Sequence, residues 1–574
     1  MNRLTFLFAC WVFWLPIPSL AAGNLPQAPS GPLVISERWP QATDLVSWTQ
    51  DVMRLEHLEN ASETAQAKAF FEWLRLFSRM AIGGMVQAYE GDYGHEAYVT
   101  DPQKNLFVYG WGYCDTFSRI AEAAWKEYKK DPLAAERVCV KHDNGDYHTM
   151  YRLRLDGGHA AFDARYGYYL IDHDAPDARV LDWAEAHANI LANREFQHRS
   201  RPFFEILGEE WDRALLLRPV YFESQEAWEK GGAPTESVFG NSQYEMGTRL
   251  HDMSFRMPRG TVIERFWDNS ARRFYVPVVS QALREWPFLP AGRFYRVTDA
   301  SLDGHWPKYD PNYQKAKPYL VQVPAGQGYP PDMVGHMTIG QAWGRIQYAP
   351  NLQAGVNDAL EPDSTLVYAD HAPYLRAREP DKGGQAIFDF YSPYVLVDGT
   401  LNAELAGAAP EDVKLEMRTL RAKAASESAP DVWSPWQTLC SGPGRATVEL
   451  GRPRFNGEDT SIHGVYRFQI RVAVKPRTSR RTPAGLSGLR FELYFENGIM
   501  SIPQIFAGAN LIQFKLRDAA ELRGPVRITY TYQTAEGEKS HTQILRAVDF
   551  HANVARYSLN APGLVRCKSL SIAY

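Results

Sequence analysis

The sequence predicts an α+β domain at the N-terminal end, followed by all-β domains that we expect to be β-sandwiches. Three observations predict this order. Helical periodicity recurs three times before about residue 130, short strands separated by turn residues follow at once, and β-type alternation resumes after residue 250. A chain of 574 residues with 45% hydrophobic and 22% charged residues can build a core in each of about three to four domains.

The first 22 residues have the pattern of a cleavable signal peptide. Arg3 supplies a positive charge, Leu4 to Leu15 form an apolar core, and Ala21 and Ala22 offer a small-residue cleavage site. The apolar run is too short to cross a bilayer comfortably, and an uncleaved N-terminal anchor is the alternative. We therefore expect a secreted or periplasmic protein that lacks residues 1–22 and has no membrane span after signal removal.

The amino-acid composition limits the kinds of molecule that the protein is expected to bind. The net charge of −5 is small and spread along the chain, whereas a nucleic-acid partner would need a concentrated basic face. Aromatic residues make up 13% of the chain, and they serve either as core packing or as exposed platforms for sugar rings. Five cysteines are too few for a disulfide-built scaffold, although Cys440 and Cys567 could pair in an oxidising compartment.

Three helices are expected, over Asp44–Leu58, Ala61–Ile82 and about Cys114–Tyr128. The second has a good N-cap in Asn60, with Glu63 three residues further on. The third carries one continuous apolar stripe at helical spacing, made of Phe117, Ile120, Ala121, Ala124, Trp125 and Tyr128.

Strands follow these helices, separated by turn residues such as Asn144-Gly145 and Tyr166-Gly167. They are expected at Arg137–Lys141, Tyr147–Leu155, His159–Arg165 and Tyr168–His173. Together with the helices they would form an α+β domain over residues 23–215. Beyond it we expect a β-rich middle region over 216–384 and one or more C-terminal β-sandwich modules over 385–574.

Cys114 is the first candidate for chemistry, because it stands at the predicted start of the third helix. The free backbone N–H groups there, together with the helix dipole, favour a thiolate and can hold an oxyanion. Asp115 follows directly, and a carboxylate beside a thiol raises the thiol pKa, although an acidic residue also suits the first turn of a helix. The alternative is that Cys114 is a small buried packing residue.

A cysteine nucleophile needs a base, and that base needs an orienting acceptor. If Tyr166-Gly167 forms a two-residue hairpin turn, His159 lies opposite Asp174 and diagonal to Asp172 on one face of the sheet. A different turn of even length could place Asp172 directly opposite His159. Both carboxylates therefore stay open as acceptors, with an ordinary acidic turn as the alternative.

The order of these motifs resembles the transglutaminase-like superfamily of papain-like folds. Gly112-Tyr113-Cys114 is similar to its nucleophile motif, and the segment from Gly167 to Asp172 is similar to its closing strand. His159 follows Cys114 by 45 residues (159 − 114), which lies in the family's range. The resemblance covers about residues 60–200 and implies Cys114 as nucleophile, His159 as base and Asp172 as orienting residue.

Aromatic residues beside this trio are expected to bind substrate, namely Trp111, Tyr113, Tyr168 and Tyr169. We expect no cofactor and no metal. Calcium sites and a substrate tunnel, which the family's protein cross-linkers would bring, have no counterpart that we can place, so we do not expect a cross-linker.

Three functions remain open. The first is a cysteine-dependent hydrolase or acyl transferase that acts on amide or related acyl bonds of an extracellular or periplasmic polymer, either protein or polysaccharide. The second is a carbohydrate-active enzyme, a polysaccharide lyase or glycoside-cleaving protein, in which His159 and a nearby tyrosine would move protons and Cys114 would be dispensable. The third is a non-catalytic binding protein that keeps the fold.

Overall fold

The computed structural model describes most of the chain in ordered elements. The described residues are 31–77, 79–80, 89–90, 97–112, 114–141, 147–156, 158–164, 168–169, 179–182, 235–238, 244–267, 273–276, 293–296, 340–341, 344–355, 358–422, 431–451, 461–462, 464–476 and 482–574. The expected signal peptide lies outside them. No helix of the described part is both long and apolar enough to cross a membrane.

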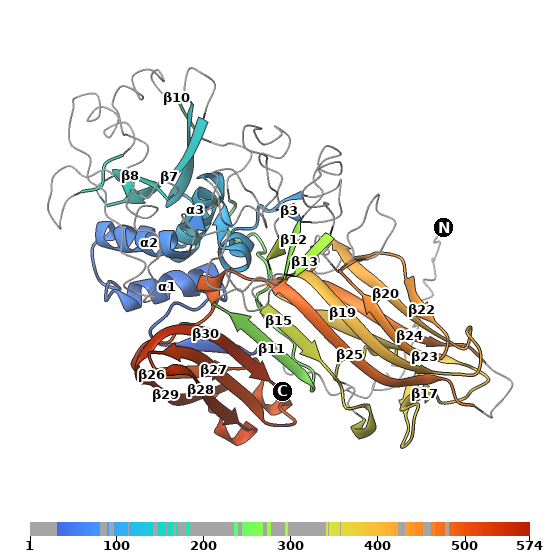
Figure 1. Cartoon of the computed structure of the whole chain (residues 1–574). Helices are drawn as coiled ribbons and strands as arrows, with labels where there is room; N and C mark the ends of the chain where they lie inside the picture. Colours follow the sequence, from blue (N-terminus) through green and yellow to red (C-terminus); the bar gives the residue numbers. More distant parts are fainter. Residues whose placement is uncertain are drawn as a thin grey trace, which may run out of the picture.

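Three α-helices form the N-terminal part of the molecule (Figure 1). They are α1 (Leu45–Leu55), α2 (Glu63–Phe77) and α3 (Cys114–Lys129). The carboxylate of Asp44 caps α1 by accepting a 2.7 Å hydrogen bond from the Ser47 N–H. A short π-helix, η1 (Lys104–Tyr109), leads toward α3. All three α-helices appear in the predicted regions, but α2 ends at Phe77 rather than Ile82, and Arg79–Met80 form a short strand instead.

A five-stranded antiparallel sheet packs against these helices, in the order β10-β6-β7-β8-β9. Its strands are β6 (Ala135–Lys141), β7 (Tyr147–Leu155), β8 (Gly158–Asp163), β9 (Tyr168–Tyr169) and β10 (Thr235–Val238). Aromatic rings fill the space between helices and sheet. Phe162 of β8, for example, lies 5.6 Å from Phe71 of α2, measured between ring centroids.

The β8–β9 hairpin differs from the predicted two-residue turn. Phe162 pairs with Tyr169 and Asp163 with Tyr168, so the four residues 164–167 connect the strands. This register shifts the expected pairing by two positions. If it continued, it would set position 172 directly opposite His159, but Asp172 lies outside the described residues, so that pairing stays a prediction.

The remainder of the described chain is β-rich, as the sequence predicts. Its largest sheet has ten strands. Eight of them follow the order β16 (Leu366–Tyr368), β17 (Leu375–Ala377), β25 (Gly485–Glu496), β15 (Gly344–Tyr348), β11 (Thr261–Phe266), β30 (Leu564–Ala573), β27 (Val526–Thr534) and β28 (Gly537–Leu545). The other two are β19 (Val395–Ala406), which pairs with β25, and β23 (Gly444–Glu449), which pairs with β19.

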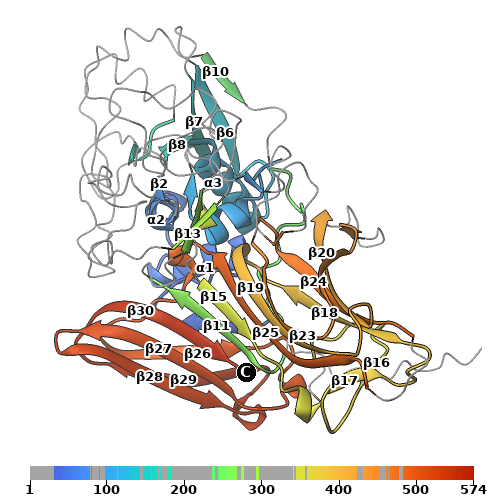
Figure 2. The ribbon, with the colours of Figure 1, turned by 45° about the vertical axis from the view of Figure 1, so that its right-hand side comes forward.

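Smaller sheets accompany it in a sandwich-like arrangement (Figure 2). One contains β18 (Gly384–Tyr391), β24 (Arg467–Val474), β20 (Val413–Ala422), β21 (Val432–Trp433) and β22 (Gln437–Ser441). Another joins β1 (Leu33–Ser36) to β26 (Gly508–Lys515) and β29 (Val554–Ala561). The short remaining strands are β2 (Arg79–Met80), β3 (Tyr89–Glu90), β4 (Ala97–Tyr98), β5 (Trp111–Gly112), β12 (Arg273–Val276), β13 (Arg293–Arg296) and β14 (Gly340–Gln341).

The expected boundary at residue 384 does not separate two independent units, which corrects the sequence-based division. β11 and β15 belong to the expected middle region, yet they lie between β25 and β30 of the expected C-terminal modules. One hydrophobic cluster also runs through both regions, from Ile263 to Ile572. The polar residues 378–383 therefore form a loop between two strands, β17 and β18, of one β-rich body. Long-range strand pairing cannot be predicted from such a local polar stretch.

The two C-terminal cysteines do not form the disulfide that was considered. Cys440 lies in β22 and Cys567 in β30, which belong to different sheets, and both are thiols. The thiol of Cys567 is buried and lies 3.5 Å from the carbonyl oxygen of Ile505. Burial raises the pKa of the Cys440 thiol above its ordinary value.

Candidate active site at the start of helix α3

Cys114 is the first residue of α3, as the sequence predicts, and only 6% of its surface is exposed. The chain reaches it through β5, which pairs in parallel with β2 so that Trp111 lies beside Arg79. The side chain therefore sits where the first backbone N–H groups of a 16-residue helix lack intrahelical partners. Such a position stabilises a thiolate and can hold an oxyanion.

Charged residues surround the first turns of α3. Asp115 contacts Arg119 at 2.8 Å and Arg137 at 2.5 Å. Arg137 extends from β6 with no exposed surface and also contacts Glu122 at 2.9 Å. Glu122 in turn pairs with Lys126 at 2.8 Å. We call these five residues, Asp115, Arg119, Glu122, Lys126 and Arg137, the α3 ion cluster. Asp115 is thus an ion-paired carboxylate rather than an isolated charge beside the thiol.

β7 runs alongside α3 in a direction that two sets of contacts define. Near Cys114, the Ser118 hydroxyl donates a 3.3 Å hydrogen bond to the Thr149 carbonyl. Just beyond the other end of α3, the Arg154 guanidinium pairs with Asp131, whose N–H bonds to the Lys126 carbonyl at 3.1 Å. The start of β7 therefore lies near Cys114, and its end lies near the last turn of α3.

His159 lies at the wrong end of this hairpin to meet Cys114. It is exposed and pairs in register with Arg154. The five residue-to-residue steps from Thr149 to Arg154 span about 17 Å along the strand. The described contacts therefore do not bring His159 to the cysteine. The sequence indicates the β8–β9 hairpin but not the direction of β7 along the helix, which decides the position of His159.

The expected substrate-binding residues fare differently from one another. Tyr169 is 2% exposed, and its ring lies 5.3 Å from that of Phe71 and 5.5 Å from that of Phe162, so it belongs to the core. For Trp111 and Tyr168 the structure describes the backbone strands alone. Tyr113 and Asp172 lie outside the described residues. The ring of Tyr169 is therefore packed against other rings, and the binding role of Trp111, Tyr113, Tyr168 and Tyr169 stays a prediction.

Two further residues lie on β7, which packs along α3, and on β8, the strand paired with β7. His148 belongs to β7, pairs with Val140 and directly precedes Thr149. Asp163 ends β8 with no exposed surface. A buried carboxylate needs hydrogen-bond donors or a counter-charge around it. The signal that could have found them is a second segment from a histidine to an aspartate, His148 to Asp163, that overlaps the one chosen.

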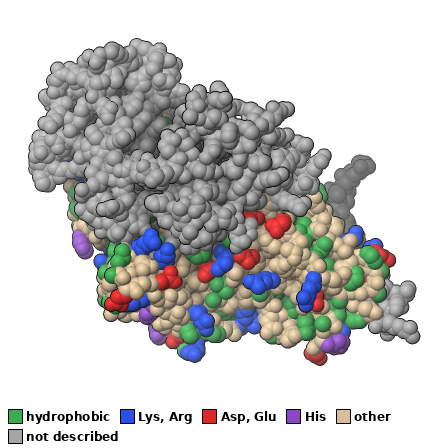
Figure 3. Space-filling view, viewed as in Figure 1, with side chains coloured by type: hydrophobic (Ala, Val, Ile, Leu, Met, Phe, Trp, Pro, Cys, Tyr) green, Lys and Arg blue, Asp and Glu red, His purple; other side chains and the backbone are tan. Residues whose placement is uncertain are grey.

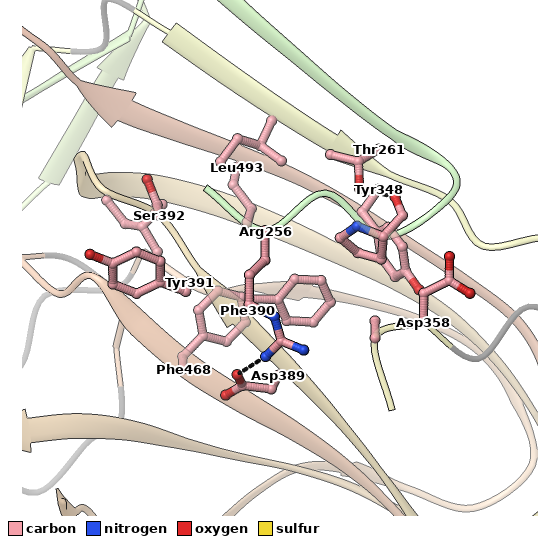
Figure 4. Close-up of a pocket in the computed structure, with 14 residues that line it drawn as sticks. Arg256, Thr261, Tyr348, Asp358, Asp389, Phe390, Tyr391, Ser392, Phe468 and Leu493 are labelled. Atoms are coloured by element: carbon pink, nitrogen blue, oxygen red, sulfur yellow. Dashed lines mark hydrogen bonds and ion pairs between the residues drawn. The ribbon is translucent and has the colours of Figure 1, made fainter. Parts of the chain in front are cut away.

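The β-rich region contains a pocket lined by both apolar and charged side chains (Figure 4). In this pocket Arg256 reaches Asp389 at 3.6 Å, and Asp389 also pairs with Arg467 at 2.9 Å. A second lining carboxylate, Asp358, pairs with Arg259 at 2.6 Å. Both acids are held by guanidinium groups in charge-assisted hydrogen bonds, which stabilise the sandwich. This arrangement suits a structural ion-pair network better than general acid catalysis.

Some of the aromatic side chains in the β-rich region make cation–π contacts with arginine. The guanidinium of Arg418 lies 4.8 Å from the Trp433 ring centroid and 4.5 Å from that of Trp436. Arg467 lies 5.2 Å from Trp433, and Arg471 lies 4.3 Å from Trp436. Each of the two indole rings therefore contacts two arginine guanidinium groups. These contacts compete with stacking of a sugar ring on the same indole.

The visible described surface mixes charges of both signs (Figure 3). Lysine and arginine side chains alternate there with aspartate and glutamate, without a continuous basic face. Among the described residues, no group of three or more histidine, cysteine, aspartate or glutamate side chains is arranged to hold a metal ion.

Comparison with known proteins adds little. No family model and no curated protein matches the sequence. Among solved structures, a glycosyl hydrolase family 2 member from Bacteroides cellulosilyticus DSM 14838 is 10% identical over 33% of this chain and 24% of its own, with a TM-score of 0.12. A β-glucuronidase from Bacteroides uniformis is 11% identical over 33% and 23%, also with a TM-score of 0.12.

A third structural neighbour is a β-galactosidase, described as putative, from Bacteroides fragilis. It is 12% identical over 32% of this chain and 28% of its own, with a TM-score of 0.11. The chain thus matches less than a third of the length of each of these enzymes. Likeness at this level carries no argument about activity.

Proposed function

We propose that the chain is a transglutaminase-like cysteine enzyme, a hydrolase or acyl transferase for amide or related acyl bonds, with Cys114 as nucleophile. The observation that carries the proposal is the position of Cys114 as first residue of α3, beside the start of β7. The helix start supplies N–H donors for an oxyanion, and the adjacent strand supplies a place for a base.

His148 is the base in this proposal, and His159 is not. His148 belongs to the end of β7 that lies near Cys114, whereas His159 pairs with Arg154 at the far end. The imidazole would take the thiol proton and later return it to the leaving group. Transglutaminase-like chemistry would therefore use a different histidine from the one that the sequence indicated first.

Asp163 takes the orienting role that the sequence assigned to Asp172. The β7–β8 ladder pairs Tyr151 with Phe162, so its next pair sets Asp163 opposite Met150. Because successive residues of a strand alternate between the two faces, positions 148 and 163 share one face of the sheet and are diagonal neighbours. A carboxylate so placed would fix the tautomer of the base and stabilise the imidazolium.

A carbohydrate-active enzyme is the second candidate, and the extensive β-sandwich region favours it. Under that alternative, acid–base groups elsewhere would act and Cys114 would be dispensable. A Cys114→Ala variant, assayed on peptide amide substrates and on uronic-acid polymers, separates the two. Loss of amide activity with a folded variant supports the cysteine enzyme, and undiminished cleavage of a polysaccharide by Cys114→Ala would refute it.

A further inference from the structure

The α3 ion cluster adjoins Cys114 at the start of α3. Asp115, the next residue in the chain, contacts Arg119 at 2.8 Å and Arg137 at 2.5 Å. Consecutive Cα atoms are about 3.8 Å apart, so these guanidinium groups lie roughly within one Debye length of the thiol. Arg137 has no exposed surface, and burial leaves its field poorly screened by solvent.

The cluster carries an excess of positive charge. It combines two carboxylates, Asp115 and Glu122, with three cations, Arg119, Lys126 and Arg137. Other charged side chains on elements that pack against α3 have their own partners. Arg152 pairs with Glu136, Lys129 pairs with Glu63, and Asp101 accepts backbone N–H bonds from Gln103 and Lys104. The cluster is therefore one source of the field at the start of α3, beside the imidazole of His148 that the proposed function invokes.

We infer that Arg137 is a positioning residue that keeps Cys114 reactive by neutralising Asp115 and joining the start of α3 to β6. This inference rests on the proposed function of Cys114 and adds a residue to it. Arg137 is tied to the start of α3 by its ion pair with Asp115, the residue after Cys114. It acts through Asp115, whose carboxylate would otherwise disfavour the thiolate. Arg119 supports the same carboxylate from one helical turn further on.

The test is the pH profile of iodoacetamide alkylation of Cys114, followed by mass spectrometry in the folded protein. Arg137→Gln should move the midpoint of the profile upward by about 0.5–1 pH unit, and Asp115→Asn should move it downward by a similar amount. At pH 6.5 the first variant should be alkylated roughly three to ten times more slowly than the wild type. Shifts of opposite sign would not follow from a merely structural role.

Further variants guard against misfolding. Arg119→Gln removes a less buried cation, with 11% of its side chain exposed, and should shift the midpoint upward by a smaller amount. Arg137→Gln combined with Glu122→Gln keeps a neutral pair in the buried position. Unchanged midpoints in folded Asp115→Asn and Arg119→Gln overturn the inference while the function stands. If the pH profile of Cys114 alkylation in the wild type equals that of Cys440, both the role of Arg137 and the proposed function are wrong.

Discussion

The hydroxyl of Ser118 donates a hydrogen bond to the carbonyl of Thr149 at 3.3 Å. This contact sets which end of β7 lies beside Cys114, and it therefore decides between two histidines. His148 precedes Thr149 in the chain, whereas His159 lies across from Arg154, about 17 Å further along the sheet.

The first prediction compares these two histidines. His148→Gln should lower the rate of Cys114 alkylation at pH 6.5 by at least about tenfold, because the thiolate loses its imidazolium partner. His159→Gln is the matched control, since it changes an exposed residue of the neighbouring strand. Its rate should stay within about twofold of the wild type. The reverse order of effects would restore His159 as the base.

Glu122 should matter greatly for stability. Its carboxylate is fully buried between Arg137 and Lys126, so Glu122→Gln leaves two buried cations poorly compensated. We expect a loss of about 3–5 kcal/mol in the free energy of unfolding, measured by urea denaturation. Arg54→Ala removes a cation whose side chain is 43% exposed and should cost at most about 1 kcal/mol. Equal effects of the two substitutions would show that the cluster does not anchor α3.

Tyr169 should behave as a core residue. Tyr169→Ala removes a ring packed against Phe71 and Phe162 and should cost about 3–5 kcal/mol in the free energy of unfolding. At a temperature where the variant stays folded, its Cys114 alkylation rate should match the wild type. A stable variant with weakened substrate binding would instead return Tyr169 to the list of binding residues.

The β-rich region should not divide at residue 384. A fragment of residues 385–574 lacks β11 and β15, so β25 and β30 would lose the strands between them and expose unpaired edges. We expect this fragment to aggregate or to unfold without a cooperative transition, as followed by circular dichroism and size-exclusion chromatography. A soluble fragment with a sharp transition would support an independent domain.

Local signals predicted the parts of the fold that depend on local physics. The apolar stripe placed α3 with Cys114 at its start, and β7 was predicted with both of its ends correct. The β8–β9 turn was wrong because Tyr166-Gly167 looks like a two-residue turn, whereas the four residues 164–167 connect the strands. Loop length between paired strands depends on packing as well as on turn residues.

The candidate site was predicted in part for the same reason. The position of Cys114 at a helix start is predicted by helix periodicity, which is a local signal. The identity of its base depends on how a strand packs along the helix, which is a long-range feature. His159 and His148 each begin a plausible strand segment that leads to an aspartate. The contact between Ser118 and Thr149 shows which of the two histidines lies near Cys114, and no sequence pattern predicts that contact. The pairing of β11 and β15 within the large sheet is also long-range, so the sequence does not predict it.

Alkylation of Cys114 in the wild-type protein tests the central claim most directly, with Cys440 as an internal reference whose thiol pKa is raised by burial. Iodoacetamide is added to the folded protein between pH 5.5 and 9, and both sites are quantified by mass spectrometry. The account predicts that Cys114 reacts at pH 6.5 at least about ten times faster than Cys440, with a profile midpoint below about 7.5. A Cys114 that reacts no faster than Cys440 and shows a midpoint near an ordinary thiol value would contradict it.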